Sequence, residues 1–83
     1  MNNVIKWKVT PKNEEPYNET FGQRLKRIRK KKGLSQTELA KITGISNVTL
    51  SAYEHDYISE PKLACVEWLC KALGVTATEL LGF

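Results

Sequence analysis

The chain has 83 residues, 41% of them hydrophobic, which is enough for one modest core but leaves no room for a second domain. No apolar run approaches the roughly 20 residues needed to cross a bilayer, and the first residues lack the pattern of a secretion signal, so we expect a cytoplasmic protein with no membrane role. The net charge of +4 is unevenly spread, because residues 20–44 hold eight Lys or Arg against one acidic residue and residues 45–83 hold two against five. Such a basic segment suits a polyanionic partner or, equally, a solvated helix face.

The first 18 residues are interpreted as an N-terminal arm and linker. Apolar and polar residues partly alternate over residues 4–10, with Ile5, Trp7 and Val9 on one face, and this predicts a short strand. Proline and polar residues then predict a linker over residues 11–18. The strand could pair with a second copy of the chain, or the arm could fold back on its own domain or lack a fixed structure.

Five helices are predicted in residues 19–83, which we interpret as one helical domain. Three of them open with a capping box, in which a Ser or Thr and a Glu or Gln three residues later each satisfy a backbone N–H group of the first turn. Glycines stand where helices commonly end. The predicted helices follow Thr20, Ser35, Ser46, Ser59 and Thr76, with Pro61 in the first turn of the fourth, and Gly33, Gly44 and Gly74 close the first, second and fourth.

Neither a metal site nor a cofactor is expected, and we predict no enzymatic activity. Cys65 and Cys70 are five residues apart, so on one helix they point roughly 140° apart and cannot form a disulfide with each other. His55 is the only histidine, and no CxxC pair is present. A chain of this length also leaves little room for a catalytic pocket.

The stretch from Gln36 to Glu54 carries the functional signal. Two helices joined by a tight turn cross closely, and the small Ala40 stands where they would meet. Gly44 supplies the left-handed conformation that the turn needs. The residues expected to point inward are Leu39, Ile45, Leu50 and Tyr53. Those left on the outer face of the second helix, where a recognition helix meets base edges, are Asn47, Val48, Ser51 and Ala52.

From about Thr20 to Leu81 the sequence resembles the lambda-repressor-like, or Cro-type, helix-turn-helix family of bacterial regulators. The matching residues are Phe21-Gly22, Leu25, Ile28-Arg29, Gly33-Leu34-Ser35-Gln36, Leu39-Ala40, Gly44-Ile45-Ser46, Leu50, Tyr53-Glu54, Pro61 and Leu73-Gly74-Val75. The resemblance implies an all-α, compact five-helix domain that binds a double-stranded DNA operator as a sequence-specific transcriptional regulator, typically a repressor.

The resemblance also implies roles for individual residues. Gln36 would bind a phosphate and brace the recognition helix, and Arg29 would form an ion pair with Glu54. Asn47, Val48 and Ala52 would face bases, although Val48 could instead pack inward, and Ser51 and Ala52 could matter only by being small. Further phosphate contacts are predicted from Ser35, Thr37 and Thr49. Lys30, Lys31 and Lys32 are predicted to form a non-specific electrostatic surface, although some of them could serve solubility alone.

The loop after the recognition helix departs from the family pattern. The family has a glycine followed by basic residues, whereas residues 55–60 are one residue longer and contain no Lys or Arg. Asp56 stands in place of the glycine, and aspartate tolerates the left-handed conformation better than most residues.

A homodimer is expected, because two copies present two recognition helices to one operator. On the fourth helix, Leu63, Val66, Leu69, Cys70 and Leu73 are assigned to the core, which leaves another face under-buried. That face, the predicted main interface, combines Cys65 and Trp68 with Leu80, Leu81 and Phe83, and Ile5 and Trp7 of the arm form an auxiliary one. The alternative function is an antitoxin or other interaction module that binds a partner protein and autoregulates its operon.

Overall fold

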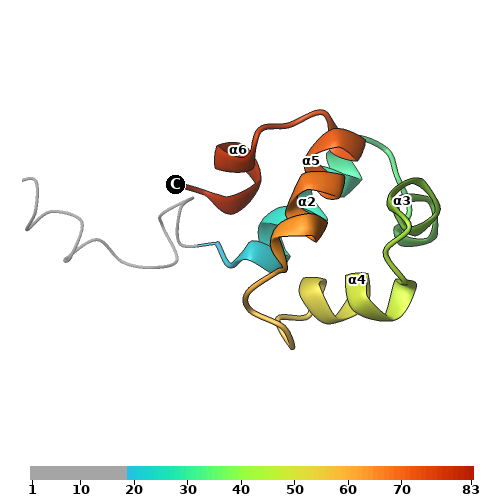
Figure 1. Cartoon of the computed structure of the whole chain (residues 1–83), viewed down its shortest axis with the longest axis horizontal. Coiled ribbons are helices and arrows are strands. Elements are labelled where there is room, and N and C mark those ends of the chain that lie inside the picture. The colour runs from blue at the N-terminus through green and yellow to red at the C-terminus, as the bar shows by residue number, and fades with distance from the viewer. Residues whose placement is uncertain (1–18) are drawn as a thin grey trace, which may run out of the picture.

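The computed structural model describes residues 19–83, so the predicted strand at residues 4–10 and the linker after it lie outside the described part. Within residues 19–83 the chain forms five α-helices and no strand, as the sequence predicts for this part (Figure 1). The helices are α2 (Phe21–Lys31), α3 (Gln36–Thr43), α4 (Asn47–Glu54), α5 (Leu63–Leu73) and α6 (Ala77–Leu81). None of these helices is long and apolar enough to span a membrane.

Local capping chemistry sets where four of the helices begin. The predicted capping boxes are present at α2, α3 and α6, and the Ser46 side chain accepts a hydrogen bond from the backbone N–H of Thr49 at the start of α4. The predicted start of the fourth helix was wrong. α5 begins at Leu63 after Lys62, which makes no side-chain capping bond, because Ser59 and Pro61 belong to the loop that returns from α4.

One leucine from each helix is fully buried, and these five side chains form the centre of the core. They are Leu25, Leu39, Leu50, Leu69 and Leu80, each 0% exposed. Burying a leucine side chain contributes about 1.5–3 kcal/mol, so every helix is held to the others mainly by its apolar face. α2 packs on α4 and α6, α3 packs on α4 and α5, and α5 packs on α6.

Two of the burial assignments predicted for the fourth helix, which is α5 in the structure, were wrong. Leu63 is 75% exposed, whereas Cys65 is 8% exposed and belongs to the core. Apolar residues occur nearly all around α5, so periodicity alone could not decide which of its faces turns inward. Cys70 is half-buried and packs at the margin of the core, and burial raises the pKa of its thiol.

The backbones of α2 and α4 come close together where Gly22 packs against the Tyr53 carbonyl. A Cβ atom at Gly22 would lie 2.0 Å from the Tyr53 carbonyl oxygen, so no larger residue fits without moving a helix. Beside this contact the Phe21 ring packs edge-on against the Tyr53 ring, with centroids 5.5 Å apart. The start of α2 therefore fixes the end of α4.

Arg24 joins the two ends of the described domain. Arg24 is 5% exposed, and its guanidinium donates hydrogen bonds of 3.1 Å to the carbonyl oxygens of Glu19 and Leu81. Gly82 is in the left-handed conformation, and a Cβ atom at this position would clash with the Arg24 guanidinium. Arg24 thus satisfies a carbonyl at the end of α6, where a cation also interacts favourably with the helix dipole.

Candidate nucleic-acid interface

The turn between α3 and α4 is fixed by its own hydrogen bonds. Gly44 has a φ angle of 80° and donates its N–H to the Ala40 carbonyl at 2.8 Å. The Thr43 hydroxyl donates to the Leu39 carbonyl at 2.8 Å and accepts from the Ile45 N–H at 3.1 Å. Because Ile45 is also buried, the angle between the two helices is set both by the backbone and by packing.

A polar cluster of three side chains ties α4 to α2 and α3. Arg29 and Glu54 form a two-pronged ion pair with N–O distances of 2.7 and 3.0 Å, and Gln36 donates to the same carboxylate at 3.3 Å. Arg29 also donates to the Leu34 carbonyl at 2.8 Å, in the loop between α2 and α3. The Arg29 and Glu54 side chains are only 9% and 2% exposed, and hydrogen bonding to Glu54 raises the pKa of Arg29.

This cluster contains the expected pair of Arg29 with Glu54 and gives Gln36 a definite position. Bidentate contacts between arginine and a carboxylate are strong and directional, so α4 is held at its C-terminal end in one orientation. Gln36 braces that end from the first residue of α3. No buried side-chain nitrogen or oxygen within residues 19–83 lacks a hydrogen-bond partner.

The outer face of α4 is open to solvent. Asn47 is exposed and Val48 is 80% exposed, which excludes the inward alternative for Val48. Ser51 and Ala52, one turn further on, are half-buried. Residues spaced by three and four lie on one face of a helix, so these four side chains form a single surface.

The start of α3 lies beside the same cluster. Ser35 and Thr37 are exposed, and Gln36 and Thr49 are half-buried. The N–H groups in the first turn of a helix have no acceptor within the helix, and they are a common place for a phosphate to bind. Glu38 satisfies the Ser35 N–H at 2.7 Å, and this hydrogen bond lowers the pKa of Glu38.

The three consecutive lysines at the end of α2 are all exposed, so they are free to act as a basic surface. Lys31 and Lys32 line a shallow hollow with Val75 and Glu79, beside the start of α6. Contact between these lysines and a phosphate stays a prediction.

The predicted C-terminal interface is only partly at the surface. Trp68 is 47% exposed and Phe83 is 82% exposed, but Cys65 and Leu80 are buried in the core of their own domain and cannot contact a second copy. Leu80 is enclosed because α6 packs on both α2 and α5. Leu81 is half-buried, and the two arm residues, Ile5 and Trp7, lie outside the described part.

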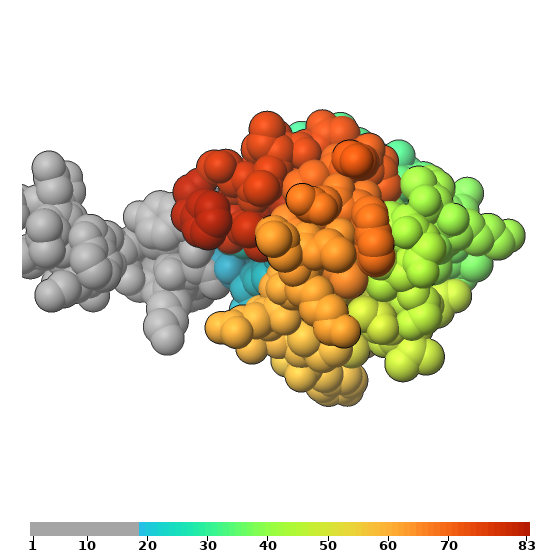
Figure 2. Space-filling model, in the orientation of Figure 1, coloured from blue at the N-terminus to red at the C-terminus, as the bar shows by residue number. Residues whose placement is uncertain are grey.

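Ile42 also lies at this surface, although the sequence did not single it out. It is 58% exposed and lines a hollow with Trp68 and Ala72, between α3 and α5. Figure 2 shows α5 (orange) at the surface between α6 (red) and the green half of the molecule that contains α3. Trp68 and Ile42 therefore form one exposed apolar patch, which we call the Trp68 patch.

Within residues 19–83, no group of three or more His, Cys, Asp and Glu side chains lies close enough together to bind a metal ion.

Comparison with known proteins places the fold in a family. The model of the helix-turn-helix family matches residues 25–80, and the chain belongs to this family. It is 36% identical over 63 residues to the immunity repressor protein of Bacillus phage phi105, which covers 76% of the chain and 43% of the repressor. Against other curated relatives the chain spans from 32% to 56% of their length.

Two solved structures of the regulator SinR have the same fold. The crystal structure of SinR, described as the master regulator for biofilm formation, in complex with DNA aligns with a TM-score of 0.72 at 35% identity. This alignment covers 75% of the chain and 98% of the SinR chain. The complex of SinR with SinI gives the same TM-score and identity and covers 60% of the matched chain.

Proposed function

We propose that this chain is a cytoplasmic, sequence-specific DNA-binding regulator of transcription, and that it acts as a repressor by placing α4 in the major groove of an operator. The observation that carries the proposal is the cluster of Arg29, Gln36 and Glu54. It fixes the inner side of α4 to two other helices, while the outer face of α4 stays open. The likeness to the DNA complex of SinR supports this role, and we assign no catalytic role to the chain.

The exposed residues of α4 fit direct readout of bases. The Asn47 amide both donates and accepts, which matches the edge of an adenine in the major groove, and the Val48 side chain can contact a thymine methyl group. Ser51 and Ala52 are small enough to let the helix backbone approach the bases.

Phosphate binding would come from the start of α3 and from the basic segment. Gln36 and the first-turn N–H groups of α3 would hold one phosphate, with Ser35, Thr37 and Thr49 as neighbouring donors. Lys30, Lys31 and Lys32 would add attraction to the DNA at longer range.

The test is selection of bound sites from a random pool of double-stranded DNA, followed by affinity measurements over a salt series. The selected DNAs should share a sequence. The slope of log K against log salt should be about −0.9 for each phosphate neutralised. No enrichment, or an affinity that does not depend on salt, would refute DNA as the ligand.

The proposal includes a homodimer formed through the Trp68 patch. A two-fold dimer presents two recognition helices about 34 Å apart, one turn of DNA, whereas a monomer presents one. Trp68→Glu puts a charge into this patch and should give a folded monomer, while deleting the first 17 residues should only weaken association. Analytical ultracentrifugation of both variants decides between them: a dimeric Trp68→Glu together with a monomeric truncation would assign the interface to the arm.

A second candidate role is binding to a partner protein, as in an antitoxin that also regulates its own operon. The observation in its favour is the exposure of the Trp68 patch. The solved complex of SinR with SinI supports it, because there a protein of this fold is bound to another protein. The two roles can coexist. An adjacent toxin-like gene would favour the antitoxin, and an adjacent phage or restriction-modification operon would favour the stand-alone regulator.

A further inference from the structure

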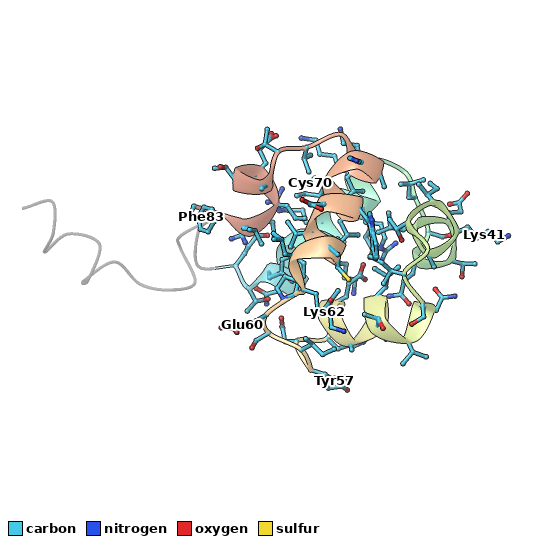
Figure 3. The ribbon with its side chains drawn as sticks, viewed as in Figure 1. Lys41, Tyr57, Glu60, Lys62, Cys70 and Phe83 are labelled. Carbon is cyan, nitrogen blue, oxygen red and sulfur yellow. The ribbon has the colours of Figure 1, made fainter. Side chains whose placement is uncertain are left out.

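A groove runs along α5 on the side away from the Trp68 patch. It has a volume of about 420 Å³, and α5 and the start of α6 form its walls. The residues that line it are Leu63, Val66, Glu67, Cys70, Lys71 and Ala77, and we call it the α5–α6 groove. In Figure 3, α5 runs upward from Lys62 towards Cys70, with α6 at the upper left. Trp68 follows Leu63 by five residues, so the two side chains point roughly 140° apart around the helix. A dimer formed through the Trp68 patch therefore leaves this groove uncovered.

An apolar strip on α5 forms the middle of the groove. Leu63, Val66 and Cys70 are spaced by three and four residues, so they lie along one face of the helix. Leu63 is 75% exposed, Cys70 is half-buried, and the buried Val66 lies deepest. Glu67 and Lys71, both exposed, stand beside the strip. The groove therefore offers an apolar surface with one charge of each sign at its margin.

The apolar face of the strand predicted in the N-terminal arm matches this strip in length. From Leu63 to Cys70 the helix rises about 10 Å. Ile5, Trp7 and Val9 alternate with polar residues, so in an extended strand they share one face and span about 13 Å. One such face would cover the whole strip and fill the groove with the Trp7 ring.

The charges of the arm also suit this side of the molecule. Residues 1–12 contain three lysines and no acidic residue. Residues 56–83 contain four acidic residues against two lysines, and Glu67 stands at the groove itself. A basic segment is attracted to such a surface, whereas the three consecutive lysines at the end of α2 would repel it.

The arm starts close enough to reach the groove of its own chain. Arg24 bonds the carbonyls of both Glu19 and Leu81, and the Glu19 carboxylate is held by a two-pronged contact with α2 at 2.8 and 2.9 Å. Residue 18 therefore joins the described part beside the end of α6. Ala77, which lines the groove, begins the same helix, about 6 Å away along its axis. Residues 11–18 span up to roughly 26–29 Å when extended, which is ample.

We propose that residues 4–10 dock as a strand in the α5–α6 groove of their own chain, with the apolar face of the strand against α5 and its lysines turned to solvent. The short linker keeps the arm at a high local concentration, which favours docking within one chain over exchange with a second copy. In Figure 1, α4 lies along the lower edge of the molecule and α6 at its upper left, so the docked arm leaves the face assigned to DNA free. Removing the arm would weaken association of two copies only indirectly, because α5 also carries Trp68.

Cys70 allows a direct test, because a thiol placed on the inner face of the docked arm would lie beside it. The variants Ile5→Cys and Val9→Cys put a thiol at either end of the apolar face, and Lys6→Cys and Lys8→Cys put one on the outer face. All four full-length variants are oxidised under the same mild conditions. A disulfide forms only where two Cα atoms come within about 7 Å of each other. At least one inner variant should form a disulfide with Cys70 several times faster than either outer variant.

Mass spectrometry of the oxidised proteins separates the outcomes. A disulfide within one chain that disappears when Cys70→Ser is added supports the proposal. A disulfide between two chains would place the arm on a second copy and overturn docking within one chain. Equal rates for inner and outer thiols, or no bond to Cys70, would overturn docking in this groove. None of these outcomes depends on DNA, so they leave the proposed function to its own test.

Thermal unfolding of the full chain gives a second test. Trp7→Ala and Leu63→Ala each remove one side of the same contact, so each should lower the Tm by about 5–10 °C. The double variant should lose little more than either single variant. Tyr57→Ala is the matched control, because Tyr57 is 81% exposed at the lower edge of the molecule in Figure 3, and it should melt like the unaltered protein. An unchanged Tm for Leu63→Ala, or additive losses, would show that the arm does not cover Leu63.

Discussion

Replacing Gly22 with alanine tests whether the contact between α2 and α4 is as close as described. The added Cβ would lie 2.0 Å from the Tyr53 carbonyl oxygen, where contacts shorter than 3.0 Å essentially never occur, so the helices must separate by about 1 Å. The obstacle is backbone and cannot rotate away. Overpacking of this kind costs up to about 3 kcal/mol, and alanine recovers about 1 kcal/mol through its higher helix propensity. The net loss of stability should be about 2 kcal/mol.

Thermal unfolding followed by circular dichroism measures this loss. For a domain of this size, about 2 kcal/mol lowers the Tm by about 8–16 °C. Gly33→Ala is the control, since it makes the same chemical change at a left-handed position with no atom within 4 Å and should cost about 1 kcal/mol through backbone strain alone. A Gly22→Ala variant as stable as the unaltered protein, or more stable, would show that helix propensity dominates and that the two helices are not in close contact.

The remaining predictions concern the ion pair, the DNA contacts and Arg24, which bonds the carbonyls of Glu19 and Leu81. Removing either Arg29 or Glu54 should lower the free energy of unfolding by about 3–5 kcal/mol, because a buried charge is left without its partner. Thermal melts of the double variant should show a loss of stability clearly smaller than the sum of the two single losses. Additive losses would mean that the two residues do not interact. Asn47→Ala should weaken binding to the operator by about 1–3 kcal/mol and relax the preference at one base position, while Gln36→Ala should weaken binding to all DNA sequences similarly. Band-shift assays that gave the reverse pattern would show that the two residues have each other's role. Arg24→Met should lower stability by about 1–3 kcal/mol, and hydrogen exchange should rise first in α6; unchanged exchange there would argue against its capping role.

Local signals made most of the fold predictable from sequence. The capping boxes at Thr20, Ser35 and Thr76 depend on side chains three residues apart, so the sequence contains everything needed to recognise them. Ser59 and Pro61 carry the same kind of signal, yet the structure uses them in a loop. The reason is tertiary, because the chain must turn back from α4 through Asp56 before α5 can begin.

The candidate site was predictable to the extent that it lies within one motif. The turn between α3 and α4 brings Gln36 beside Glu54. Arg29 joins them from α2 and pairs with Glu54, as the resemblance implied. The surface of α5 was harder, because a helix that is apolar on most sides does not show by its pattern which face is covered. Leu80 illustrates the limit: α6 has only five residues, too few for periodicity to show that this residue enters the core.

Arg24 has a consequence for how this domain can be combined with other chains. Because one guanidinium bonds the carbonyls of both Glu19 and Leu81, the first and last turns of the described part of the chain lie side by side. Domains whose ends lie together tolerate circular permutation and insertion into loops of other proteins. We therefore expect residues 19–82 to fold when they are inserted into a loop of a host protein, because that loop would have to open by little more than the width of one side chain.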